Sequence, residues 1–135
     1  MAVLGLSYKP DTWVIERSQG VELAQKLAES GAQVVVHDPQ ALDPARAVLG
    51  SSVEYADTLE SAIAEADVIV IATPWRDYKA LHADIRPNRD IRVFDCWDFV
   101  DAAAFEELPQ AELIRIGRHH PNSIKRSDQA ISSVG

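Results

Sequence analysis

Residues 67–73, DVIVIAT, are the most hydrophobic stretch of the chain and indicate its fold class. Their apolar side chains form a continuous run rather than an alternating one, which is typical of a strand covered on both faces of a sheet. Shorter apolar runs bounded by turn residues lie before and after this one. They predict four further strands, over residues 2–6, 33–39, 91–96 and 112–117.

Helical segments separate these strands. A helix is predicted to begin near Ser18, a good N-cap residue, and to end at Gly31, a favourable residue just past a helix end. Asp57 and Glu60 resemble a capping box that opens another helix, which we expect to reach about Ala66. Shorter helical segments are predicted over residues 43–48, 75–82 and 101–107.

Strands that alternate with helices form a parallel sheet, and right-handed crossovers place helices on both of its faces. The sequence therefore predicts an α/β fold: a Rossmann-like, three-layer, doubly wound domain with a mainly parallel sheet of about five strands. We expect this domain to occupy residues 1–118. Residues 119–135 lack apolar periodicity, and we expect them to form a partly disordered tail.

The composition excludes several classes of protein. With 47% apolar and 25% charged residues, the chain of 135 residues is not disordered throughout, and no apolar run approaches the ~18–20 residues of a membrane span. It shows no secretory signal, and one cysteine excludes an internal disulfide, so we expect a cytoplasmic location. The net charge of −8 disfavours nucleic acid or a membrane as a partner. Because the chain opens directly in a core strand, we expect a fragment of a longer protein; a naturally short reading frame is the alternative.

The loop over residues 7–17 carries the strongest functional signal. It has about eleven residues, whereas loops between a strand and a helix usually have about two to six. It also lies at the carboxyl end of a strand, the edge where doubly wound sheets bind ligands. No G-x-G-x-x-G pattern follows Gly5, so a dinucleotide cradle is not expected here. Asp38 at the end of the second strand suits a ribose, but a turn-forming Asp-Pro pair is the favoured interpretation.

Four segments occur in a recognisable order: GLSYKPDT (5–12), VVVHDP (34–39), DVIVIATPW (67–75) and VFDCW (93–97). Together they resemble the C-terminal domain of the UDP-glucose/GDP-mannose dehydrogenase family, over about residues 2–117. The first string is specific when the other three follow it in this order.

The resemblance implies a function for the chain. Family enzymes oxidise the C6 alcohol of a nucleotide-linked sugar, in polysaccharide biosynthesis, and use NAD that a separate N-terminal domain binds. The domain resembled here would hold the nucleotide diphosphate of a UDP- or GDP-sugar and close the active-site cleft. It would not be catalytic alone, because the family's catalytic cysteine lies upstream. Its expected partners are the N-terminal NAD-binding domain and, in the full-length enzyme, further copies in a homo-oligomer.

The resemblance also implies roles for residues of the first loop. Tyr8 and Lys9 would face the diphosphate, although a lysine in a loop can also be merely solvated. Thr12 would bind phosphate or cap the loop, and capping is at least as well supported. The family arginine that reaches toward NAD falls on Glu16, so Arg17, one position later, inherits that contact only by a shift.

Two aromatic residues follow the third main strand. Trp75, and Tyr78 beside it, would stack on the base of the nucleotide or simply cover the edge of the sheet, and the sequence favours neither. Trp13 in the first loop is unusual for a loop residue, and it is a candidate for burial against neighbouring domains.

The sequence departs from the family near the fourth main strand. A D-G-R pattern reads Asp95, Cys96 and Trp97 here, so the arginine that contacts substrate phosphate is missing, and Asp98 is expected to add repulsion. A divergent subfamily with another phosphate clamp is the favoured explanation; a degenerate, weakly binding paralogue is the other. A non-enzymatic, Rossmann-like interaction module is the alternative function. The candidate replacements for the arginine are Arg76, Arg118 and Lys125.

Two further constellations are weaker. Cys96 and His37 both end strands and would suit a nucleophilic pair, but a buried small cysteine is the favoured interpretation. Adjacent histidines point in different directions and no carboxylate spacing supports them, so no metal site is expected. The histidines considered for such a site are His37, His82, His119 and His120.

Overall fold

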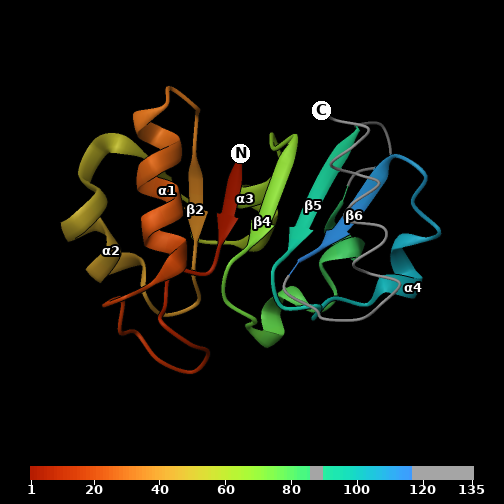
Figure 1. Ribbon diagram of the computed structural model, residues 1–135, viewed down its shortest axis with the longest axis horizontal. Coiled ribbons are helices and arrows are strands. Elements are labelled where there is room, and N and C mark those ends of the chain that lie inside the picture. Colours follow the sequence, from red (N-terminus) through yellow and green to blue (C-terminus); the bar gives the residue numbers. More distant parts are fainter. Residues whose placement is uncertain (86–89, 117–135) are drawn as a thin grey trace.

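The computed structural model describes residues 1–85 and 90–116 (Figure 1). This part of the chain contains one six-stranded sheet with the order β3-β2-β1-β4-β5-β6, and every neighbouring pair is parallel. The strands are β1 (Ala2–Leu4), β2 (Val35–His37), β3 (Glu54–Tyr55), β4 (Val68–Ile71), β5 (Ile91–Asp95) and β6 (Ala111–Arg115). The helices are α1 (Gln19–Glu29), α2 (Leu42–Leu49), α3 (Leu59–Ile63) and α4 (Ala102–Phe105), with short 3-10 turns η1 (Gly50–Ser52), η2 (Arg76–Tyr78) and η3 (Leu81–Asp84).

The predicted Rossmann-like, doubly wound fold is confirmed, with one strand more than the expected five. The additional strand is β3, which has only two residues and pairs with β2 at the edge of the sheet. A strand this short carries no alternation or apolar run that a sequence pattern could reveal.

The first helix begins and ends where the sequence predicts. The Ser18 side chain accepts a hydrogen bond from the backbone N–H of Val21, and Gly31, with φ 95°, follows the C-cap. The capping box predicted for α3 is wrong by one residue. Thr58 is the N-cap and accepts from the Ser61 N–H at 3.1 Å, and the helix ends at Ile63, earlier than expected.

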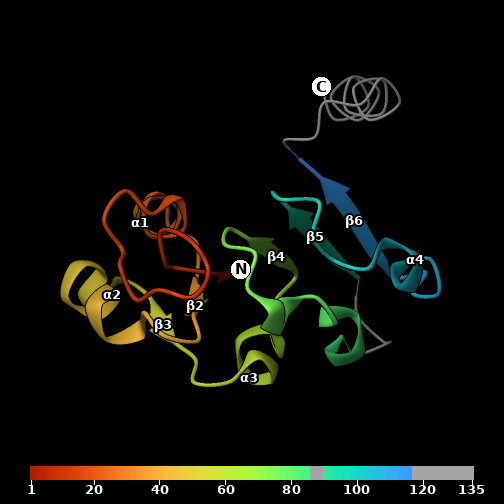
Figure 2. The same cartoon turned by 90° about the horizontal axis from the view of Figure 1, so that it is seen from below.

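Two apolar clusters cover the two faces of the sheet. Val3 and Val36 face α1 and α2, whereas Leu4 and Ile71 face α3, the 3-10 turns and α4. Figure 2 shows α1 and α3 on opposite sides of the strands. These two layers bury the central strands β1 and β4 on both faces, which explains the continuous apolar run that indicated the fold.

The order of the strands reverses between β1 and β4. The chain runs outward from β1 to β3 on one side, then from β4 to β6 on the other. The Ala72 N–H donates to the Leu4 carbonyl at 2.8 Å, so the carboxyl ends of β1 and β4 lie side by side. Such a switch point is where open α/β sheets bind their ligands, and the long first loop starts there.

Candidate functional site

Two glycines bring α1 close to the end of β1. Gly5 has φ 101°, and an added Cβ would lie 2.5 Å from Thr73. A Cβ on Gly20 would overlap the carbonyl oxygen of Gly5, so the first turn of α1 packs directly on the backbone that leaves β1. Close approach of this kind is what glycines provide in dinucleotide folds, but here the whole first loop separates the two glycines.

Asp38 anchors the base of the first loop. Asp38 is 3% exposed, and its carboxylate accepts hydrogen bonds from three segments of the chain, since a buried carboxylate requires such donors. The contacts occupy both oxygens, which supports the turn-forming interpretation of Asp38 over a ribose contact. The donors are Leu6 N (2.7 Å), Ser7 N (2.9 Å), Ser7 Oγ (2.7 Å), Gln40 N (2.8 Å), Ala41 N (2.8 Å) and Trp75 Nε1 (3.1 Å).

Beyond this anchor the first loop projects its side chains into solvent. The Tyr8 N–H donates to the Val14 carbonyl at 2.6 Å and closes the loop, while Tyr8 itself is 55% exposed. Lys9 is exposed, and within the described residues it forms no hydrogen bond or ion pair. Its ammonium is therefore accessible to a ligand at the carboxyl edge of the sheet.

Three other residues of this loop differ from Lys9 in their contacts or their backbone conformation. The Thr12 hydroxyl accepts from the Val14 N–H at 3.2 Å, which is the capping contact that the sequence offered as an alternative to phosphate binding. Arg17 is exposed and has φ 61°, and Asp11 has φ 64°. Left-handed backbone at non-glycine residues costs energy and often occurs at functional sites.

The two aromatic residues after β4 are both buried. Trp75 is 5% exposed and donates its indole N–H to Asp38. Tyr78 has no exposed surface, and its hydroxyl lies 2.9 Å from His37 Nδ1 and donates to the His37 carbonyl at 3.2 Å. These contacts support the sheet-covering interpretation of both rings and leave little of Trp75 for a base.

A second buried carboxylate organises the loop after β5. Asp95 has no exposed surface and accepts from the N–H groups of Trp97 (3.0 Å), Phe99 (2.6 Å) and Val100 (2.9 Å). Trp97 is 50% exposed, and its indole N–H donates to the Ala72 carbonyl at 2.9 Å. This exposed, anchored indole was not among the aromatic candidates from the sequence.

An ion pair compensates the charge of Asp98 in this loop. Arg115 at the end of β6 donates to its carboxylate at 2.9 Å, and this ion pair offsets the repulsion expected from the sequence. Arg115 was missed as a cation at this edge, although it stands in register with Asp95 on the neighbouring strand. Of the expected replacements, Arg76 is exposed at the start of η2, and Arg118 and Lys125 lie outside the described residues.

The Cys96–His37 pair cannot form a nucleophilic dyad. Cys96 follows β5 and His37 ends β2. Strands β1 and β4 separate these two strands in the sheet, which puts them roughly 14 Å apart at the usual strand spacing. Burial, with Asp95 nearby, raises the pKa of the Cys96 thiol, and burial lowers the pKa of His37. Both shifts favour the neutral forms, as expected for structural residues.

The described ranges hold no group of three or more His, Cys, Asp or Glu side chains arranged to bind a metal ion. His119 and His120 fall outside those ranges. Among the helices that can be described, none has the length and apolar character needed to cross a membrane.

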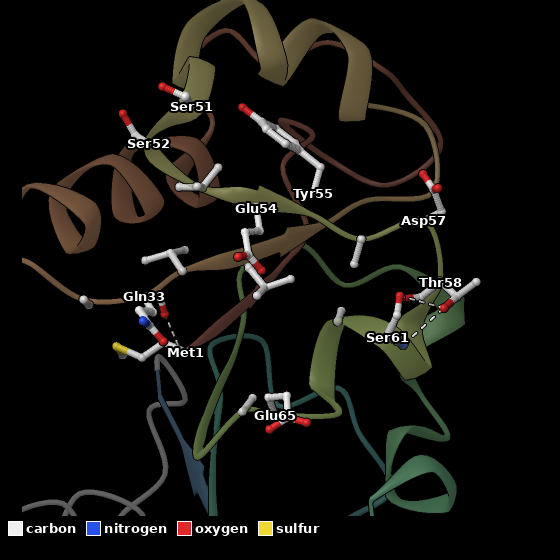
Figure 3. A pocket seen from close by; sticks show the side chains of 17 residues that line it. Met1, Gln33, Ser51, Ser52, Glu54, Tyr55, Asp57, Thr58, Ser61 and Glu65 are labelled. Atoms are coloured by element: carbon white, nitrogen blue, oxygen red, sulfur yellow. Dashed lines mark hydrogen bonds between the residues drawn. The ribbon is translucent and has the colours of Figure 1, made fainter.

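A groove of about 940 Å³ lies away from these loops, between α3 and strands β2 and β3 (Figure 3). Its lining includes Glu54 on the strand side and Glu65 on the helix side, with Asp57 between the two elements. Carboxylates repel a diphosphate, whereas the switch point offers an exposed lysine. We therefore place the candidate ligand site at the carboxyl edge of the sheet and not in this groove.

Comparison with known proteins identifies the family of the chain. The sequence model described as "UDP-glucose/GDP-mannose dehydrogenase family, UDP binding domain" matches residues 2–102. UDP-glucose 6-dehydrogenase AglM of Haloferax volcanii is 38% identical over 95 residues, which are 70% of this chain and 22% of that protein. A solved structure of a UDP-glucose dehydrogenase from Pyrobaculum islandicum has a TM-score of 0.66 and 35% identity, and covers 86% of this chain and 24% of the other.

The chain spans about a fifth of the length of the curated relatives that it matches, 22% for AglM and 18% for YwqF of Bacillus subtilis. A hypothetical protein from Sinorhizobium meliloti, with a TM-score of 0.55 at 14% identity, shares the fold alone. The matched residues 2–102 make up most of the chain and include the first loop and both aspartate-anchored turns. The chain therefore belongs to the UDP-glucose/GDP-mannose dehydrogenase family, in which it corresponds to the UDP-binding domain.

Proposed function

We propose that this chain binds the nucleotide diphosphate of a UDP- or GDP-sugar as one part of an NAD-dependent sugar-nucleotide 6-dehydrogenase, and that it closes the active-site cleft over the substrate. It is not catalytic alone. The observation that carries the proposal is the exposed Lys9 at the switch point, without a partner in the described part of the chain.

The chemistry of the first loop supports this role. A lysine ammonium on a phosphate oxygen forms a charge-assisted hydrogen bond of about 1.5–3 kcal/mol. Asp38 holds the base of the loop, and Pro10 restricts the backbone next to Lys9, so less conformational freedom is lost on binding. Tyr8 stands beside Lys9 as a second substrate-binding residue, and Thr12 and Trp75 contribute by shaping the loop and the sheet edge.

The residues of this chain do not fit NAD itself. The glycine-rich turn that cradles a dinucleotide is absent from its usual place after Gly5, and both oxygens of Asp38 accept from protein donors instead of a ribose. In our proposal NAD is bound by the N-terminal domain of the full-length enzyme, and Arg17 is the residue of this chain that faces it. Assembly with that domain, and into a homo-oligomer, belongs to the same proposal.

The test is a calorimetric or NMR titration of the chain with UDP and GDP. Lys9→Ala should weaken binding of the preferred nucleotide by about 1.5–3 kcal/mol and leave the melting temperature nearly unchanged, because Lys9 is exposed. Lys26→Ala is the matched control, an exposed lysine in the last turn of α1, and should bind like the wild type.

Equal affinities for the wild type and Lys9→Ala would refute the role of Lys9. A folded chain that binds neither nucleotide would favour the alternative function, a non-enzymatic or degenerate Rossmann-like interaction module.

A further inference from the structure

The backbone N–H and the indole N–H of Trp97 both form hydrogen bonds, yet half of the surface of this residue is exposed to solvent. Its backbone N–H donates to Asp95 Oδ1 at 3.0 Å, and its indole N–H donates to the Ala72 carbonyl at 2.9 Å. Nevertheless 50% of the residue is exposed. Burying a large aromatic surface is favourable, so an indole fixed in this exposed position presents a preformed apolar face.

The anchor of the indole places it beside the switch point. Ala72 directly follows β4, and its Cβ would lie 3.3 Å from a Cβ added to Gly20, in the first turn of α1. Thr73, the next residue, donates its hydroxyl to the Ser7 carbonyl at 2.9 Å, immediately before Tyr8 and Lys9. Trp97 and the Lys9 loop are therefore tied to consecutive residues at the end of β4, and Figure 2 looks onto this edge.

The neighbouring residue keeps the loop in this shape. Asp98 adopts φ 53°, and its ion pair with Arg115 joins the loop to the end of β6. A backbone in this region is retained only when its surroundings determine it. The position of Trp97 is thus set by Asp95, Ala72 and the Asp98–Arg115 pair.

The other tryptophans at this edge lack this combination of exposure and anchoring. Trp75 is buried, and its indole N–H binds Asp38. Trp13 is 65% exposed, but it sits in the middle of the first loop, and no hydrogen bond of its indole is seen in the described structure.

We propose that Trp97 is the platform on which the base of the bound nucleotide stacks, so that the loop after β5 recognises the ring while Lys9 contacts the diphosphate. This inference rests on the proposed function and deepens it. Stacking of a base on an aromatic side chain is tolerant of base identity, because every base has a π-face. Trp97 therefore contributes affinity for the nucleoside, and uridine and guanosine nucleotides both fit it.

The experiment compares Trp97→Leu with Trp97→Phe. Neither variant can make the hydrogen bond to Ala72, so they differ mainly in whether an aromatic ring remains. UDP and GDP are the base-containing ligands, and inorganic pyrophosphate is the ligand without a base. We expect Trp97→Leu to bind UDP about tenfold to hundredfold more weakly, Trp97→Phe to retain most of the affinity, and pyrophosphate to bind all three proteins alike.

Equal UDP affinity for Trp97→Leu and the wild type would overturn the proposal. So would an equal loss of UDP and pyrophosphate binding in Trp97→Leu, because a disturbed loop would then explain the effect. The proposal would also be overturned if the wild-type chain bound UDP no more tightly than it binds pyrophosphate.

A measurement on the unmodified chain does not depend on variant folding. The indole N–H resonances of Trp97 and Trp75 are recorded by NMR during a UDP titration. The Trp97 signal should shift with the ring current of the base, and the buried Trp75 signal serves as the internal reference; an unmoved Trp97 signal at saturating UDP would exclude stacking.

These outcomes separate the two proposals. If Lys9→Ala weakens binding of both UDP and pyrophosphate while Trp97→Leu changes neither, the proposed function stands and the stacking role falls. If the wild type binds no nucleotide at all, both fall together.

Discussion

The loops after β1 and β5 both depend on a buried aspartate, but they present different chemistry to solvent. Asp38 organises the first loop and Asp95 the second, each by accepting backbone N–H groups at the carboxyl edge of the sheet. In the first loop the charged side chain Lys9 is exposed and unpaired among the described residues. In the second loop the charge of Asp98 is neutralised by Arg115, and the exposed group is the indole of Trp97.

In our proposal the two loops therefore bind different parts of the nucleotide. Arg115 neutralises the charge of Asp98 within the protein. The second loop therefore offers a ligand the apolar surface of Trp97 instead of electrostatic attraction. The first loop keeps its ammonium free and can attract a diphosphate. A nucleoside diphosphate contains one group suited to each loop.

The largest expected effect comes from removing the two anchors. Asp38→Ala leaves six donors without their acceptor and should lower the free energy of unfolding by about 3–5 kcal/mol, whereas Asp95→Ala leaves three and should cost roughly 2–3 kcal/mol. Urea denaturation followed by circular dichroism measures both. A larger loss of unfolding free energy for Asp95→Ala than for Asp38→Ala would show that the second loop depends more on its aspartate than the first. Asp38→Asn provides a milder variant if Asp38→Ala does not fold.

A smaller effect should follow from separating α1 from the base of the first loop. Gly20→Ala places a methyl group against the Gly5 carbonyl, and overpacking of this kind costs about 1–3 kcal/mol of stability. Gly31→Ala is the control, because nothing lies within 4 Å of an added Cβ there and only its φ of 95° opposes alanine. If thermal or chemical unfolding showed Gly20→Ala to be as stable as the wild type, the close packing of α1 on β1 would not contribute to stability.

The smallest effect concerns the ion pair of the second loop. Arg115 and Asp98 side chains are 34% and 16% exposed, and solvent screening limits such a pair to about 0.5–1 kcal/mol. A double-mutant cycle with Arg115→Gln and Asp98→Asn isolates their coupling from the other contacts of Asp98. A coupling energy near zero would show that the Arg115–Asp98 pair does not hold the loop after β5.

The fold and the first loop were accessible from sequence because their signals are local. The continuous run at residues 67–73, the N-cap at Ser18 and Gly31 after the first helix each reflect a preference of neighbouring residues. The capping box at Asp57 was misplaced by one residue because Asp57 and Thr58 are both acceptable caps, and the choice depends on how the helix meets the sheet.

The exposure of the tryptophans could not be predicted from local sequence patterns. Trp75 follows the most hydrophobic strand and was a natural candidate for stacking, yet its indole is buried against Asp38, 37 residues away in sequence. Trp97 is half exposed, and its indole N–H donates to the Ala72 carbonyl, 25 residues away. No pattern within one segment distinguishes these two tryptophans, since their exposure depends on contacts between strands.

By itself the sequence determined the class of fold, the family and the loop that carries Lys9, because apolar runs, capping residues and a specific string of residues act over short distances along the chain. Only the tertiary structure decided which side chains are available at the carboxyl edge. It buried Trp75, exposed Trp97 and paired Asp98 with Arg115, since hydrogen bonds and burial depend on neighbours that the strand order of the sheet brings together.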